Sequence, residues 1–296
     1  MSLAVNEFTI TADLPNYVPA SVGQRIEGLL ALSIVQVDTI LSLISLPENA
    51  QIEWWKNYNY IEDLNDERGY TVTLFGATSG TGDLAVILDF LRARKETHKL
   101  LGFYDVLKTK RGPDVSGIQG MVRTIQTLGN DKDWQGAVWD EYVNEYWVFV
   151  TRFCNLTLTR PGPVLNTPLV KGFILDAAIN HGPDIEAYQV IFDEMKNNTN
   201  ADEKEWFKDF AETRRLILAR GYEHLDTSNT GDRSTLWANM ANENNWNLTR
   251  PIQPFEGEGD NLNIGIGAKD ACCLHGNWDK HAVVFYKALN CHNFVV

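Results

Sequence analysis

The sequence predicts a mainly α fold with one small antiparallel β-sheet, in the α+β class. Apolar residues between Val22 and Leu46 recur at the spacing of a helix that buries one face. The segment Tyr70–Gly76 has the alternation and the β-branched and aromatic content of a strand. Few other strands are evident before residue 250. Further helical patterns follow at about 134–153, 168–180, 184–196 and 203–222.

The length and the composition along the chain indicate how it is divided. At 296 residues the chain can bury a substantial core, as one large domain or as two lobes. We expect one domain over residues 1–250, with the small sheet forming a lobe at about 60–80. Residues 1–20 lack periodicity and are predicted to be an extended arm. Residues 251–296 are rich in glycine and cysteine and are predicted to be a C-terminal extension.

Three acidic residues lie where predicted elements begin or end. Pro47 is expected to stop the first long helix, which places Glu48 just past its end. Asp66 lies in the polar turn before the strand. Asp83 follows the glycine-rich turn 79–82 and starts another helix, where it serves as an N-cap, as a ligand contact or as both. All three side chains are therefore attached to rigid elements.

The charge of the chain restricts its partners. It has 39 acidic and 26 basic residues, which give a net charge of −13. This charge, without a long Lys/Arg run, argues against nucleic acid or an anionic membrane surface as a partner. It favours a cationic ligand, or it reflects solubility alone. No stretch of about 18 uncharged apolar residues predicts a membrane span, and no signal peptide is evident.

The cysteines and the glycine-rich turn give no sign of a cofactor. Cys154 is isolated, and we expect a disulfide between Cys291 and either Cys272 or Cys273. A zinc site in this tail is the alternative, but the ligand spacing matches no zinc pattern. The turn 79–83 lacks the Gly-Lys-Ser/Thr ending of a phosphate-binding loop. We therefore predict no metal and no cofactor.

Carboxylates and aromatic side chains alternate between residues 48 and 83. They are Glu48, Glu53, Trp54, Trp55, Tyr58, Tyr60, Glu62, Asp63, Asp66, Glu67, Tyr70 and Asp83. Hydrolysis of a glycosidic bond needs one carboxylic acid to protonate the leaving oxygen and one carboxylate to activate water or attack. The pattern is typical of a site that grips sugar rings and performs this chemistry. Of Trp54 and Trp55, one is expected to face the core, and the other is able to stack on a sugar.

Three motifs in this stretch carry a family resemblance. They are Glu48-Asn49, the sequence YNYIEDLNDERGYT at 58–71 and the sequence SGTGD at 79–83. Together they resemble the catalytic block of the family 46 glycoside hydrolases, endo-acting chitosanases with a lysozyme-like architecture. The resemblance implies two lobes flanking a substrate cleft, with Glu48 as general acid and Asp66 as general base. It implies inverting hydrolysis of β-1,4 linkages in chitosan.

The same resemblance implies roles for further residues. Arg68 would keep Asp66 ionised, and Thr71 would help to hold the attacking water. Contacts with sugar are implied for Tyr60, Gly76, Thr81, Asp83, His181 and Pro183.

More thinly, the resemblance continues to about residue 250. It is carried by DAAINHGP at 176–183 and by Arg214 followed by HLDTS at 224–228. Asp176 is predicted to face inward, where a carboxylate needs a partner. Arg214 and Arg233 are the candidates, either as a network that supports the catalytic residues or as ordinary structural ion pairs. The implication for His224 is weaker.

Three positions depart from the family pattern. Glu67 stands where the family has glycine, Thr78 where it has cysteine, and Ala50 where serine is common. The change at Ala50 removes one implied sugar contact, so the finer substrate preference stays open.

We therefore expect an inverting endo-chitosanase that acts on chitosan or glucosamine oligosaccharides, as a secreted monomer. Two alternatives remain. One is a non-catalytic glycan-binding or effector protein, and the presence of both Glu48 and Asp66 argues against it. The other is a lysozyme-like hydrolase of another polysaccharide, which Ala50 leaves open.

Overall fold

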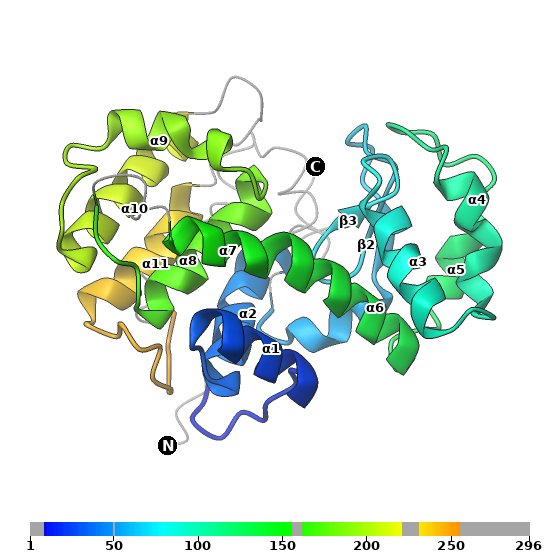
Figure 1. Ribbon diagram of the computed structural model, residues 1–296, viewed down its shortest axis with the longest axis horizontal. Helices are drawn as coiled ribbons and strands as arrows, with labels where there is room; N and C mark the ends of the chain where they lie inside the picture. The colour runs from blue at the N-terminus through cyan, green and yellow to red at the C-terminus, as the bar shows by residue number, and fades with distance from the viewer. Residues whose placement is uncertain (1–8, 50, 156–161, 221–230, 255–296) are drawn as a thin grey trace, which may run out of the picture. The chain divides into compact units, whose positions relative to one another are not determined.

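The computed structural model describes residues 9–49, 51–155, 162–220 and 231–254. The chain forms two compact units (Figure 1). The first unit combines Met1–Ile52 with Tyr146–Val296, and the second unit is the continuous segment Glu53–Glu145. The expected disulfide of Cys291, the C-terminal extension beyond residue 254, and His224 lie outside the described residues.

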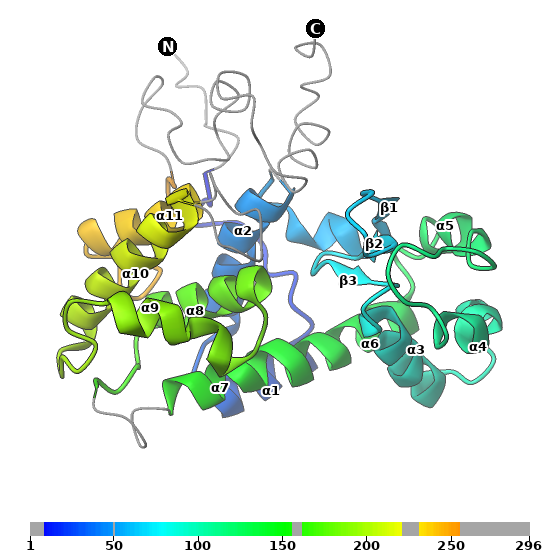
Figure 2. The same ribbon diagram turned by 90° about the horizontal axis from the view of Figure 1, so that it is seen from above.

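The first unit is built around α8 (Pro168–His181), whose residues from Pro168 to Ala178 are all buried. This helix packs against α2 (Ile34–Asn49), α7 (Val148–Cys154) and α11 (Gly231–Asn242). A helix that is apolar all round is expected to be central. The other helices of this unit are α1 (Ala20–Leu30), the 3₁₀ helix Ile185–Tyr188, α9 (Gln189–Glu194) and α10 (Glu203–Arg220). Helices α10 and α11 lie side by side in Figures 1 and 2.

Gly172 allows α8 to pack closely against its neighbours. A Cβ atom at this position would lie 2.7 Å from the Trp237 ring and 2.8 Å from the Ile40 side chain. The next residue, Phe173, meets the Phe207 ring edge to face at 5.1 Å between centroids. A larger residue at 172 would force α2 and α11 away from α8, because protein interiors are close-packed.

The first predicted helix is two helices in the structure, and the second of them ends later than predicted. The chain breaks after α1 at Ala31, which has a left-handed φ of 51°, and α2 begins at Ile34. Ser33 and Gln36 form a reciprocal capping box, since the Gln36 amide donates to Ser33 Oγ (3.3 Å) and the Ser33 amide to Gln36 Oε1 (2.9 Å). Pro47 does not stop α2, although it has no amide to donate to the carbonyl four residues earlier. Glu48 therefore lies in the last turn of α2, not beyond it.

The second unit contains the predicted small antiparallel sheet. Its strands are β1 (Ile61–Asp63), β2 (Tyr70–Val72) and β3 (Ala77–Thr78), in the order β1-β2-β3. Thr71 pairs with Glu62 on one side and with Thr78 on the other. The predicted strand 70–76 is too long, because the chain turns at Thr73 (φ 65°) and Gly76 (φ 73°) to form a hairpin.

Helices and aromatic side chains complete the second unit. They are the 3₁₀ helices Trp54–Asn59 and Lys99–Phe103, with α3 (Asp83–Arg94), α4 (Tyr104–Leu107), α5 (Gly120–Ile125) and α6 (Lys132–Tyr142). Trp54 is 1% exposed and meets the Trp139 ring edge to face at 5.8 Å. Trp54 is thus the core member of its pair, whereas Trp55 is partly exposed.

The longer predicted helices are present, but two of them include a π-helical or 3₁₀ turn. The predicted helix 134–153 is α6, a π-helical turn at Val143–Trp147 and then α7. The pattern 184–196 is a 3₁₀ turn followed by α9. Helices α8 and α10 match the patterns 168–180 and 203–222 within two residues at each end.

Arg250, in the last described segment of the first unit, binds residues of the N-terminal part of that unit. Its guanidinium pairs with Asp38 Oδ2 at 2.8 Å and donates to the Leu14 carbonyl at 2.9 Å. Both side chains of the pair are buried. A two-residue bridge joins Ile10 to Ile252 beside this contact, so part of the predicted N-terminal arm is held in place.

No single helix among the described residues is long and apolar enough to cross a membrane. Helices α1 and α2 pass that test together, but they are bent by 95°. Within the described ranges, no group of three or more His, Cys, Asp and Glu residues could hold a metal ion.

Candidate functional site

The first unit holds one cluster of candidate residues, which consists of Glu48, Asp176, Arg214 and Arg233. Arg233 Nη2 lies 2.5 Å from Glu48 Oε1, and its Nε lies 2.8 Å from Asp176 Oδ1. Arg214 Nη1 lies 3.0 Å from the other oxygen of Asp176. Arg233 therefore connects the carboxylate of Glu48 to a buried carboxylate behind it.

Burial makes this cluster rigid. Asp176 and Arg214 have no exposed side-chain surface, whereas Glu48 is 30% exposed. Asp176 is buried because it lies on the central helix α8, and the two guanidinium groups satisfy both of its oxygens. Charged groups inside a protein are tolerated when they are paired and hydrogen-bonded in this way. The buried, paired residues of the cluster thus hold the partly exposed carboxylate of Glu48 in a fixed position.

Arg214 also contacts the end of α8. Its Nε donates to His181 Nε2 (3.1 Å), and its Nη2 donates to Asn180 Oδ1 (3.1 Å). Asn180 was not predicted as a site residue, although it lies within the motif that suggested His181. Pro183 follows Gly182, whose φ of 95° ends the helix, and both are partly exposed.

His181 is a neutral side chain in this setting. Desolvation, followed by the charges of Arg214 and Arg233, holds the pKa of His181 well below its ordinary value. Because Nε2 accepts a hydrogen bond from Arg214, the ring proton is on Nδ1. His181 therefore presents a polar, uncharged group near pH 7.

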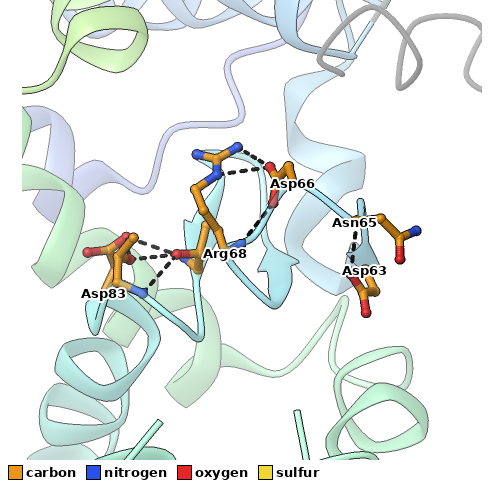
Figure 3. A network of polar contacts seen from close by, with 7 residues as sticks. Asp63, Asn65, Asp66, Arg68 and Asp83 are labelled. Carbon is orange, nitrogen blue, oxygen red and sulfur yellow. Dashed lines mark hydrogen bonds and ion pairs between the residues drawn. The ribbon is translucent and has the colours of Figure 1, made fainter. Parts of the chain in front are cut away.

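The second unit holds a cluster around Asp66 (Figure 3). Arg68 Nε and Nη2 donate to Asp66 Oδ2 at 2.9 and 2.5 Å, and the Arg68 amide donates to Oδ1 at 3.2 Å. The Asp66 side chain is 7% exposed. A carboxylate that accepts hydrogen bonds from a guanidinium and a backbone amide is favoured in its charged form. This turn therefore holds the Asp66 carboxylate in place by contacts from a residue only two positions away.

The turn that carries Asp66 is strained on both sides of it. Asn65 has a φ of 54°, and Glu67 has a φ of 67°. Asparagine tolerates this left-handed region, but glutamate does not favour it. Glu67 is the position at which the family pattern has glycine. The backbone thus shows why glycine suits that position and why glutamate there has an energetic cost.

We expect Glu67→Gly to stabilise the protein by about 1 kcal/mol. Relief of left-handed strain contributes roughly 1–2 kcal/mol, and the greater freedom of glycine in the unfolded chain offsets roughly 0.5–1 kcal/mol. Urea unfolding measures the change. Glu67→Ala is the matched control, since it removes the same exposed side chain but keeps the strain. Equal stabilisation by both variants would show that the carboxylate, and not the backbone, is responsible.

The Asp83 carboxylate accepts hydrogen bonds from the turn that precedes it (Figure 3). Its Oδ2 accepts from Thr81 Oγ1 (2.6 Å) and from the Thr78 amide (3.3 Å). It is the first residue of α3, and the N-cap position is Gly82, without a side-chain cap. The interpretation of Asp83 as an N-cap is therefore wrong, because its carboxylate turns back toward the glycine-rich turn.

The other predicted residues of the second unit lie on or near the sheet. Thr71 Oγ1 is buried, and no hydrogen-bond partner is found for it within the described residues. Tyr60 OH donates to Glu62 Oε2 at 3.2 Å. Desolvation, and then the neighbouring Glu62 and Asp66, raise the pKa of Tyr60, so its phenol stays protonated. Gly76 is in the hairpin turn described above and is partly exposed.

Sequence reasoning missed one unusual carboxyl group, Glu141 on α6. Burial raises its pKa to about 8, and the charges of Asp83 and Glu145 add to the effect. No motif marks this position, because its burial results from the packing of α6 against α3. The signal that the sequence offers is the place of Glu141 on the same helix face as Trp134, Ala137 and Val138, which are apolar.

The predicted residues thus fall into two groups, which the structure describes separately. Asp176, Arg214, Arg233, His181 and Glu48 are brought together in the first unit. In the second unit, Arg68 contacts Asp66, and Thr81 contacts Asp83. Ala50, whose change leaves the substrate preference open, is not among the described residues.

Comparison with known sequences yields one family and a consistent group of relatives. The profile described as glycosyl hydrolase family 46 matches residues 42–252. A chitosanase of Niallia circulans is 25% identical over 260 residues, which cover 79% of this chain and 79% of the relative. A chitosanase of Bacillus subtilis (strain 168) is 26% identical over 237 residues, which cover 75% and 82%.

Comparison with solved structures also finds chitosanases. The native chitosanase of Bacillus subtilis MY002 superposes with a TM-score of 0.64 and 26% identity, over 75% of this chain and 94% of that one. A mutant of that chitosanase, complexed with 6 GlcN, gives a TM-score of 0.64 and 25% identity over the same shares. These similarities confirm the predicted lysozyme-like α+β fold.

Proposed function

The chain belongs to glycosyl hydrolase family 46, and we propose that it cleaves the β-1,4 linkages of chitosan from within the polymer, with inversion of configuration. Glu48 is the general acid and Asp66 the general base. One observation carries the proposal: the family match spans both clusters, in which Arg233 holds the Glu48 carboxylate and Arg68 holds the Asp66 carboxylate. The relatives named as chitosanases support the substrate.

Asp66 suits the role of base. A general base must be ionised before it activates water, and the contacts of Arg68 favour the charged form. Thr71 supports the same step, because a buried hydroxyl without a partner within the described residues can hydrogen-bond a water. The proposed roles of Arg68 and Thr71 are therefore to hold the base ionised and to orient the water.

Glu48 suits the role of acid by its exposure and its support. Its partial exposure lets a substrate oxygen reach it, while Arg233 fixes its direction. Arg233 contacts Glu48 and the buried Asp176 at the same time, so the Glu48 carboxyl is tied to a fixed network. A general acid needs both a fixed direction and an accessible proton.

The substrate is proposed to be recognised partly by charge. Chitosan carries protonated amines below roughly neutral pH, and the chain has a net charge of −13. Asp83 is the proposed amine ligand, because its carboxylate accepts only from a hydroxyl and an amide and has no cation partner within the described residues. Tyr60, Gly76, Thr81, His181 and Pro183 are proposed to contact sugar.

The stereochemistry of the product tests the mechanism directly. The first reducing ends released from β-linked glucosamine oligomers should be α-anomers, because water attacks the face opposite the leaving group. Proton NMR of the early products, before mutarotation, measures this. Early β-anomers would mean a covalent intermediate and would refute the role of Asp66 as a base.

Asp83→Ala is expected to raise the KM for chitosan about tenfold, since a hydrogen bond to a charged group contributes roughly 1.5–3 kcal/mol. The melting temperature should fall as well, because the Thr78 amide and the Thr81 hydroxyl lose their acceptor. Steady-state kinetics and thermal melts measure both effects. Asp83→Asn separates charge from shape, and a normal KM for that variant would contradict recognition of the amine by charge.

We also propose that the enzyme acts outside the cell, as a monomer. Chitosan is a polymer too large to be imported intact, so an endo-acting enzyme has to meet it outside. Fractionation of the source cells and sedimentation of the purified protein test the two statements. Activity confined to the cell interior would contradict the first, and a concentration-independent dimer would contradict the second.

A further inference from the structure

Asn180 is a side chain of the first unit that the proposed mechanism does not use. It lies in the last turn of α8 and is partly exposed. Arg214 Nη2 donates to its Oδ1 at 3.1 Å. A guanidinium group has donors but no acceptor, so the oxygen of the Asn180 amide has to face Arg214. The direction of the amide is therefore determined, and its Nδ2 group points away from Arg214.

The Nδ2 group of Asn180 supplies two hydrogen-bond donors. Within the described residues, no acceptor is found for them. The next acidic side chain, Asp184, accepts instead from the Glu186 amide at 3.1 Å, at the start of the following 3₁₀ helix. A carboxamide donor binds an uncharged oxygen, as in a carbonyl or a hydroxyl group, and cannot bind a protonated amine, which is itself only a donor.

The turn that carries Asn180 belongs to the helix face that supports Glu48. Asp176 and Asn180 are four residues apart on α8, so they share one face and are separated by about 6 Å along the axis. Asp176 is buried on this face, and Arg233 joins it to Glu48 through contacts of 2.8 and 2.5 Å. A sugar that reaches Glu48 is therefore expected near the exposed end of that face, where Asn180 lies.

The charges of this cluster also disfavour an ammonium group. As the proposed acid, Glu48 carries a proton before the reaction. The cluster then contains the two guanidinium groups of Arg214 and Arg233 and the single carboxylate of Asp176. His181, which also contacts Arg214, is neutral. The excess of positive charge opposes a protonated amine at this place and permits an uncharged acceptor.

We propose that Asn180 is a specificity-determining residue: its Nδ2 group donates to the acetamido carbonyl of an N-acetylglucosamine unit. The sugar bound against the end of α8 is thus an acetylated one, and glucosamine amines bind where carboxylates accept them, as at Asp83. The substrate is then a partially acetylated chitosan. This inference rests on the proposed function and concerns the preference that Ala50 leaves open.

The test sequences the products that the full chain releases from a partially acetylated chitosan. Mass spectrometry of the oligomers, with the new reducing end labelled by heavy-oxygen water, identifies the unit on each side of the cut. We expect one position near the cut to hold an acetylated unit more often than the polymer average. Asn180→Asp keeps the size of the side chain but replaces the donors by an oxygen. It should lower this preference about three- to tenfold, the effect of one lost hydrogen bond.

Two further variants separate recognition of the sugar from support of Arg214. Asn180→Leu removes the donors without adding a charge and should lower the same preference, and it decides the question if the aspartate variant does not fold. Asn242→Asp changes an exposed asparagine of the same unit and should leave the preference unchanged. A purely structural role for Asn180 predicts that cleavage slows alike for every arrangement of units, and that result would overturn the proposal.

Cleavage of fully deacetylated chitosan, measured in parallel, tests the proposed function by itself. If the chain releases no products from either polymer, the proposed function is wrong as well. If it cleaves the deacetylated polymer but excludes acetylated units from every position beside the cut, only the role of Asn180 is wrong. A preference that persists in Asn180→Asp and Asn180→Leu has the same meaning, because any bond from Asn180 would then go to a sugar hydroxyl, which acetylated and deacetylated units share.

Discussion

Glu48→Gln and Asp66→Asn are each expected to lower the rate of chitosan cleavage about 10²–10⁴-fold. The amides keep the shape of the side chains, but they can neither donate a proton as an acid nor accept one as a base. Loss of a positioned acid or base typically costs a factor of this size. Release of reducing ends from chitosan at saturating substrate measures the rate.

Controls separate this chemistry from the general effect of losing a charge. Glu53→Gln and Asp133→Asn make the same substitutions at exposed residues whose partners are surface lysines. Both should cleave chitosan at the normal rate. Binding of glucosamine oligomers to the two site variants should also persist, which would show that they fold. Near-normal cleavage by either site variant would refute the assignment of its residue.

Asp176→Asn is expected to destabilise the first unit by about 3–5 kcal/mol. The change leaves Arg214 and Arg233 buried with an excess of positive charge, and breaking a buried ion pair costs about this much. Urea unfolding, followed by tryptophan fluorescence, measures the loss. Because Arg233 also directs Glu48, the folded fraction of the variant should show a lower kcat with a nearly unchanged KM.

Asp133→Asn is the matched comparison for stability. It removes the same charge from an exposed pair with Lys95, and such pairs contribute about 0–1 kcal/mol. If Asp176→Asn unfolds at the same urea concentration as this control, the buried network contributes no stability. A normal kcat for Asp176→Asn would separate the network from the positioning of Glu48.

Features determined by neighbouring residues could be predicted from the sequence. The turn that fixes Asp66 depends on Arg68, two residues away, and the start of α3 at Asp83 follows from the glycine-rich turn before it. Motif spacing is sufficient for such contacts. The pairing of Asp176 with Arg214 and Arg233 was predicted because an inward-facing carboxylate on a buried helix needs a cation.

Features determined by packing or by competing local signals could not be predicted. Hydrophobic spacing continued across Ala31, so it hid the break between α1 and α2, although Ser33 and Gln36 mark a helix start. The strand β1 has three residues, too few for an alternating pattern. The environment of Glu141 arises only when α3 packs against α6. The direction of the Asp83 carboxylate depends on the turn backbone rather than on its place at the start of a helix.

The order of the two units along the chain has a consequence for synthesis. The second unit is one continuous segment, so all of its residues have left the ribosome once Glu145 and the following exit-tunnel length are made. The first unit is interrupted, and Asp38 stays without its Arg250 partner until more than two hundred further residues are added. We therefore expect the second unit to fold first during synthesis. The N-terminal helices of the first unit should reach their final packing only after the later part of that unit has been made.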